Sequence, residues 1–141
     1  MTGYAERKGR SGKRSELKKS INDSTFTALR HDVINSPSFL GLSNSAKVAF
    51  LHLLAKYNRK NNGDLSAPQS RSKQEFNLSA PSLRTGLKEL EQNGFIETTR
   101  QGGKNQCSLY AVTCLPRNDV NKAGIFIKAT ERPSDKWKKS F

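Results

Sequence analysis

Hydrogen-bond donors recur along one side of a predicted helix over residues 80–92. Arg84, Lys88 and Gln92 are spaced four residues apart, so a helix brings them onto one surface, and Thr85 lies on the same side. Arginine and lysine donate hydrogen bonds to phosphates and to guanine, and glutamine pairs with adenine. This surface therefore offers hydrogen bonding to a nucleic acid; the ordinary alternative is a polar face turned to water.

The opposite side of the same helix is apolar. Leu83, Leu87 and Leu90 cluster within about 60° of one another when the helix is drawn at about 100° per residue. This side is predicted to face the core. Glu89 and Glu91 are expected on its flanks, away from the donor surface.

Local signals define both ends of this helix. Ser79 is a good N-cap, Pro81 suits the first turn, and Gly94 supplies a left-handed stop. A short helix over residues 70–76 and a tight turn precede it. The candidate DNA-contacting residues of the longer helix are Ser79, Ser82, Arg84, Thr85, Lys88 and Gln92.

A β-hairpin is predicted directly after this helix. Residues 95–100 and 106–113 are rich in β-formers, and Gly102-Gly103 between them is expected to provide the positive-φ turn. A basic, polar tip can contact phosphates, although it can also be a simple exposed hairpin. The candidate residues of this segment, 100–106, are Arg100, Gln101, Gly102, Gly103, Lys104 and Asn105.

Helix, turn, helix and hairpin in this order are typical of a winged helix-turn-helix. Helical patterns over residues 26–35 and 44–57 precede them, and the second has an apolar face wide enough for a central core helix. The predicted fold class is α+β: a three-helix core with a β-hairpin wing, an extra N-terminal helix and basic terminal arms. We expect a disordered basic arm at 1–24, the winged-helix domain at 25–115, and a C-terminal extension with a basic tail at 116–141.

Positive charge is concentrated at the two ends of the chain. The 141 residues include 25 Lys and Arg against 12 Asp and Glu, a formal net charge of +13. Residues 1–20 carry a net +5 and residues 128–141 a net +3. Such an excess favours a polyanionic partner. The candidate contacts in the arms and flanks are Arg7, Lys8, Arg10, Lys13, Arg14, Arg71 and Lys73.

Several other classes of protein find no support. No apolar run reaches the roughly 20 residues of a membrane span, and the N-terminus lacks the apolar core of a secretory signal. Cys107 and Cys114 are spaced to point to opposite faces of one strand, and His31 and His52 stand alone, so neither a metal site nor a catalytic site is predicted. We expect no enzyme activity, no cofactor and no metal, and a cytoplasmic, nucleoid-associated location.

Short motifs along residues 36–113 also carry a resemblance. They are LSNSAK (42–47), NNGDL (61–65), LKELEQNGFI (87–96) and TRQGG (99–103). The chain resembles small winged-helix proteins of proteobacteria, phages and mobile elements, some of which continue with segments like SLYAVT (108–113) and PSDKW (133–137). This resemblance implies the fold and DNA binding, but it implies no target.

The combined interpretation is sequence-specific binding of double-stranded DNA by a transcriptional regulator of a phage or mobile element. In this hypothesis helix 80–92 enters the major groove and the wing contacts the backbone. Two alternatives stay open: an accessory module of replication initiation or partition, and a factor that binds a host protein. A homodimer is a further alternative, with helix 26–35 or the apolar residues 125–127 as its contact.

Overall fold

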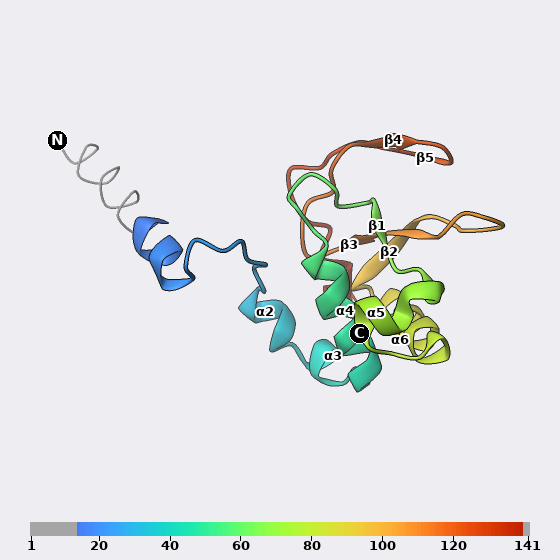
Figure 1. Cartoon of the computed structure of the whole chain (residues 1–141), viewed down its shortest axis with the longest axis horizontal. Coiled ribbons are helices and arrows are strands. Elements are labelled where there is room, and N and C mark those ends of the chain that lie inside the picture. Colours follow the sequence, from blue (N-terminus) through green and yellow to red (C-terminus); the bar gives the residue numbers. More distant parts are fainter. Residues whose placement is uncertain (1–13, 140–141) are drawn as a thin grey trace.

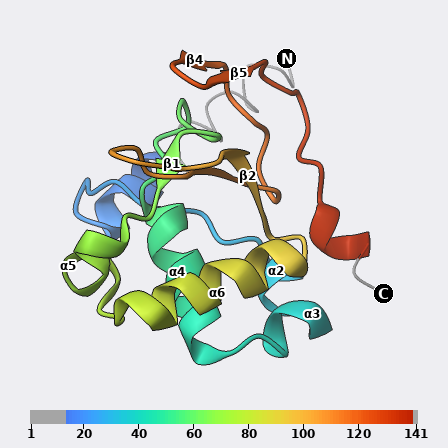
Figure 2. The same cartoon turned by 90° about the vertical axis from the view of Figure 1, so that its right-hand side faces the viewer.

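A computed structural model describes residues 14–139, and it has a mixed α+β architecture (Figure 1). The helices are α2 (His31–Ile34), α3 (Pro37–Leu40), α4 (Asn44–Ala55), α5 (Ser72–Phe76) and α6 (Ala80–Gln92), with short 3-10 turns η1 (Gln69–Arg71) and η2 (Lys136–Lys139). The strands are β1 (Leu65–Ser66), β2 (Ile96–Arg100), β3 (Leu109–Val112), β4 (Val120–Lys122) and β5 (Ile125–Ile127). Helices α4, α5 and α6 lie on one side of the sheet β1-β3-β2, and the β4–β5 hairpin lies on the other side (Figure 2).

Helices α4 and α6 form the centre of the helical layer. Ser43 caps α4 by accepting a hydrogen bond from the Ala46 amide, and the Glu89 carboxylate on α6 accepts from the Ser43 amide at 2.8 Å and from its hydroxyl at 2.7 Å. Gly86 lets the helices approach closely, because a Cβ atom there would lie 3.0 Å from the carbonyl oxygen of Ser45. The beginning of α4 is therefore fixed against the middle of α6.

Aromatic side chains fill the core beneath these helices. Phe39, Phe50 and Phe95 meet edge to face with ring centroids 5.4–6.0 Å apart. The indole of Trp137 stacks on the Phe95 ring at 6.0 Å and is only 5% exposed. The C-terminal segment thus packs into the core.

A buried amide fastens the sheet to the loop that follows it. The Asn62 side chain is fully buried and donates to the carbonyl oxygens of Val112, Leu115 and Pro116 at 2.9–3.1 Å. Its own oxygen accepts from the Val112 amide at 2.8 Å. Every polar atom of this amide has a partner, which is the condition for burying it without a large cost.

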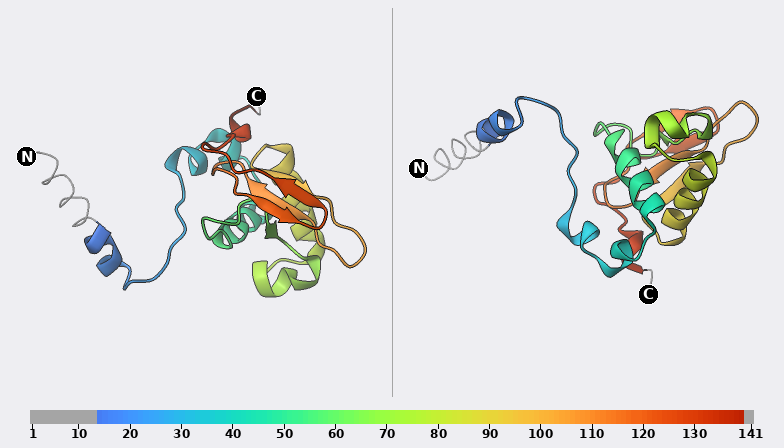
Figure 3. Two further views of the ribbon diagram at one scale, coloured as in Figure 1. Left: turned by 90° about the horizontal axis from the view of Figure 1, so that it is seen from above. Right: turned by 60° about the horizontal axis from the view of Figure 1, so that its bottom comes forward.

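The region before α2 differs from the sequence prediction. Residues 14–20, expected to lack structure, form a short helix, in keeping with the helix-forming Glu, Leu and Lys that they contain. The helix expected over residues 26–35 is wrong over most of its length, because residues 24–30 are extended and only His31–Ile34 is helical. The extended segment carries the exposed side chains of Phe26 and Leu29 and joins residues 14–20, which stand apart, to the rest of the fold (Figure 3).

Candidate nucleic-acid interface

The donor-bearing side of α6 is turned to the surface. Leu83, Leu87 and Leu90 are buried as predicted, together with Gly86. Residues of the polar side are exposed, except Ser82, which is partly buried beside the cap. The exposed candidates of this helix are Arg84, Thr85, Lys88 and Gln92. Ser79 caps the helix by accepting from the Ser82 amide at 3.2 Å, and the two hydroxyls also bond to each other.

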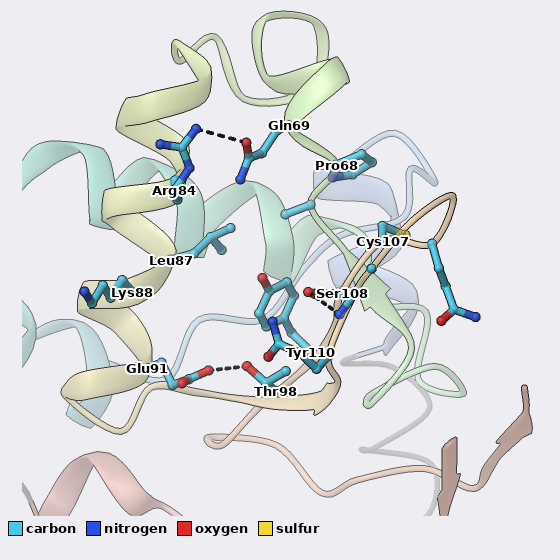
Figure 4. A pocket seen from close by; sticks show the side chains of 15 residues that line it. Pro68, Gln69, Arg84, Leu87, Lys88, Glu91, Thr98, Cys107, Ser108 and Tyr110 are labelled. Carbon is cyan, nitrogen blue, oxygen red and sulfur yellow. Dashed lines mark hydrogen bonds between the residues drawn. The ribbon is translucent and has the colours of Figure 1, made fainter. Parts of the chain in front are cut away.

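A groove of about 570 Å³ runs between the edge of α6 that carries Arg84 and Lys88 and the β2–β3 hairpin; Thr85 and Gln92 do not line it. Figure 4 shows side chains from both walls directed into it. Arg84, Leu87, Lys88 and Glu91 come from α6, and Ser108 and Tyr110 come from β3 and the residue before it. The remaining lining residues are Ala67, Pro68, Gln69, Thr98, Gln101, Gly102, Gly103, Gln106 and Cys107.

The guanidinium of Arg84 is oriented at one end of this groove. It donates to the side-chain oxygen of Gln69 on η1 at 3.2 Å (Figure 4). Arginine has five N–H donors in a fixed fork, so this one bond sets the direction of the side chain and leaves donor capacity for a ligand. Arg84 is thereby suited to two-pronged contact with a phosphate or with a guanine.

A tyrosine hydroxyl lies on the hairpin side of the groove. Burial raises the pKa of the Tyr110 phenol above its usual range, although a hydrogen bond with Ser108 opposes the shift. The hydroxyl therefore stays protonated near neutral pH and can donate to an anion. Sequence reasoning missed Tyr110 and Ser108, but their spacing of two residues on a predicted strand is a signal that places them on one face.

The tip of the hairpin differs from the prediction. Gly103 and Gln106 exchange two backbone hydrogen bonds at 2.9 and 3.1 Å, so Lys104 and Asn105 form the turn, and Asn105 takes the positive φ of 61°. Gly102 instead serves a close approach, because a Cβ atom there would lie 2.6 Å from the Ser108 amide nitrogen. Lys104 and Asn105 are exposed, so the tip presents a cation and an amide to solvent.

Arg100 does not lie at the tip of the hairpin. Its guanidinium donates to the carbonyl oxygens of Ala123 at 3.1 Å and Cys107 at 2.9 Å. Ala123 belongs to the turn between β4 and β5, so Arg100 joins the two hairpins. Arg100 therefore does not frame the turn together with Lys104, whereas the exposed Gln101 and the partly buried Gly102 line the groove.

The flanking cations are not gathered in the groove. Arg71 forms an ion pair with Glu75 at 2.7 Å, and Lys73 is exposed on α5. Arg14 is exposed in the short N-terminal helix. The remaining arm candidates lie outside the described residues; they are Arg7, Lys8, Arg10 and Lys13.

The two glutamates near the end of α6 have different surroundings. Glu89 bonds to Ser43, away from the groove, as expected. Glu91 is exposed and lines the groove, where its carboxylate accepts a hydrogen bond from the Thr98 hydroxyl. The expectation that Glu91 lies away from the donor surface is wrong, because the hairpin folds over the flank on which this residue sits.

The described part of the chain contains no group of three or more His, Cys, Asp or Glu side chains that could hold a metal ion. Within residues 14–139 no helix is both long and apolar enough to cross a membrane.

Comparison with known proteins assigns no family to this chain. No family model matches the chain, and no curated protein matches it. One similar solved structure is the N-terminal domain of a DNA-binding protein, with a TM-score of 0.49 and 17% identity over 74% of this chain and 83% of that one. Another is a Rep–DNA complex, with a TM-score of 0.49 and 16% identity over 75% and 85% of the two chains. A likeness of this degree assigns neither a family nor a function.

Proposed function

We propose that this chain is a winged helix-turn-helix protein that binds double-stranded DNA in a sequence-specific manner. In this proposal α5 and α6 form the helix-turn-helix, α6 enters the major groove, and the β2–β3 hairpin contacts the neighbouring backbone. The proposal rests mainly on the observation that Arg84 and Lys88 of α6 border one groove with the hairpin (Figure 4). Within this proposal the chain acts as a transcriptional regulator of a phage or mobile element.

The contents of the groove suit a nucleic acid better than a small apolar ligand. Arg84 and Lys88 supply charge, and Tyr110 and Ser108 supply hydroxyls on the opposite wall. Charged and hydroxyl donors are the groups that position a phosphate backbone. The major groove of B-DNA is wide enough for one α-helix, and the 13 residues of α6 correspond to a length of about 20 Å.

Selection of bound sequences from a random DNA library is the first test. A recovered motif would then serve as the specific probe in mobility-shift assays, beside random DNA. The double variant Arg84→Ala, Lys88→Ala is expected to weaken binding to the motif far more than binding to random DNA, because base contacts are lost together with charge.

A matched control removes the same charge elsewhere. Lys60 and Lys128 are exposed and do not line the groove. The double variant Lys60→Ala, Lys128→Ala is expected to weaken both probes by similar factors. Equal losses on the two probes for the Arg84, Lys88 variant would contradict the assignment of α6 as the recognition helix.

A further inference from the structure

Glu91 shares the groove with the two cations of α6. Arg84, Lys88 and Glu91 are separated by four and three residues, so they lie along one surface of the helix (Figure 4). Glu91 is the one acidic residue among the described residues that line the groove. The negative charge of Glu91 weakens the attraction of this surface to DNA phosphates. A carboxylate at this place is therefore better explained by a specific contact than by general affinity for DNA.

The position is electrostatically unfavourable for a carboxylate. Glu91 lies in the last turn of α6, where the partial negative charge of the helix end repels an anion. A nearby DNA phosphate would repel it as well. Two base amino groups donate hydrogen bonds in the major groove, N4 of cytosine and N6 of adenine. A carboxylate is matched to cytosine, because the N6 group of adenine lies beside the N7 acceptor, which repels a carboxylate oxygen.

The structure holds Glu91 in a fixed direction without using all of its acceptor sites. The Thr98 hydroxyl on β2 donates to one carboxylate oxygen of Glu91. An ionised carboxylate offers about four lone-pair sites on two oxygens. The second oxygen can therefore accept from a base while the Thr98 bond keeps the side chain in place.

We propose that Glu91 is a specificity-determining residue that selects cytosine by accepting a hydrogen bond from its N4 amino group. This inference rests on the proposed binding of α6 in the major groove. Arg84, oriented by Gln69, is matched to the O6 and N7 acceptors of guanine. Seven residues of helix rise by about 10.5 Å, so the guanine and the cytosine are expected about three base-pair steps apart, at about 3.4 Å per step.

Two variants distinguish a purely structural role of Glu91 from a role in recognising a base. Glu91→Gln keeps the length of the side chain and can still accept from Thr98, but glutamine pairs with adenine. Thr98→Val removes the tie between α6 and β2 and leaves the carboxylate unchanged. Circular dichroism and thermal unfolding of each variant show whether it folds, and Glu91→Ala serves as a third variant at this exposed site.

Library selection with the wild-type chain and these variants tests the inference. The wild type is expected to select cytosine at one position by on the order of tenfold or more. Glu91→Gln is expected to change that position from cytosine to adenine, Glu91→Ala to lose the preference, and Thr98→Val to weaken the preference while cytosine stays the selected base. Affinity for random DNA is expected to rise about two- to fivefold in Glu91→Gln, because one repulsive charge is gone.

Failure of this inference differs from failure of the proposed function. An unchanged motif in Glu91→Gln or in Glu91→Ala, or selection of a base other than cytosine by Thr98→Val, would overturn the role of Glu91 while the other positions of the motif still supported α6 as the reader. Binding without any sequence preference would overturn both the role of Glu91 and the sequence specificity of the proposed function. No binding of wild-type protein to DNA would overturn both proposals.

Discussion

Arg30 and Asp135 form an ion pair at 2.7 Å although they are 105 positions apart in the chain. The same guanidinium bonds to Asp32 at 2.6 Å and to the carbonyl oxygen of Cys114 at 2.9 Å, and it lies over the Trp137 ring. The extended segment before α2 is thereby joined to the C-terminal segment, with the stacked ring of Trp137 beneath the ion pair.

Trp137→Ala is expected to destabilise the fold by about 3 kcal/mol, since the buried indole loses its contact with Phe95 and leaves a cavity. Urea unfolding monitored by far-ultraviolet circular dichroism gives the free energy of unfolding. Phe126→Ala is the matched control, because that ring is 69% exposed and its removal should change the free energy by less than about 0.5 kcal/mol. Equal losses in the two variants would mean that Trp137 does not pack in the core in solution.

Glu75 is expected to make stability depend on pH. Hydrogen bonds from Lys56 and then Arg71 hold the pKa of the Glu75 carboxyl below its usual range, against the opposing effect of burial. A pKa lowered in the folded state contributes stability above the unfolded pKa, and this contribution is lost as the pH falls through the folded value. Glu75→Gln should therefore be less stable than wild type at pH 7, and the difference should shrink below about pH 4.

The control for this pH effect is Glu131→Gln, because Glu131 is exposed and has no ion pair among the described residues. Its stability difference from wild type is expected to stay small at every pH. A Glu75→Gln difference that is constant from pH 7 to pH 3 would show that the carboxylate charge does not contribute.

The two cysteines are expected to react at very different rates. Cys107 is exposed at the groove, whereas burial raises the pKa of the Cys114 thiol to about 11. Because the thiolate is the reactive form, one equivalent of a thiol reagent should react rapidly with the native protein and a second only after denaturation. Cys107→Ser should remove the rapid phase, and bound DNA should slow it in the wild type. Rapid labelling of DNA-bound protein would argue that DNA does not cover this part of the groove.

The basic N-terminal residues are expected to add affinity without sequence preference. Residues 1–20 contain seven Lys and Arg. Their deletion should weaken binding to all DNA sequences and reduce the slope of log K against log salt by about 0.9 for each lost phosphate contact. Binding isotherms at several salt concentrations measure this slope. An unchanged slope after deletion would mean that these residues do not touch phosphate.

Local signals in the sequence were enough to predict helix α6, but not to predict how the hairpin packs against it. The Ser79 cap and the spacing of the leucines are set by residues that are close in the sequence. The bounds of α6 and its buried side could therefore be predicted from the sequence alone. The place of Glu91 could not follow, since it depends on where the hairpin folds over the helix. The turn at Lys104-Asn105 depends on the strand register that the close approach of Gly102 to Ser108 permits.

The extended segment 24–30 shows the same limit. Phe26 and Leu29 fit a helical stripe in the sequence, yet both are exposed in the structure. The bonds from Arg30 to Cys114 and Asp135 bridge 84 and 105 positions of the chain, and no local pattern encodes such partners. The long-range contacts of Arg30 at the end of this segment outweigh the helical propensity that the sequence indicates.

Arg100 gives the two hairpins a common mechanical behaviour. Its bonds to Ala123 and Cys107 connect the β2–β3 hairpin to the turn of the β4–β5 hairpin. Lys122, at the end of β4, is in turn anchored to Asp64 at 2.8 Å. A force on the hairpin tip at Lys104 is therefore transmitted to the β4–β5 hairpin and to Asp64. These contacts restrict bending of the β2–β3 hairpin relative to the rest of the fold.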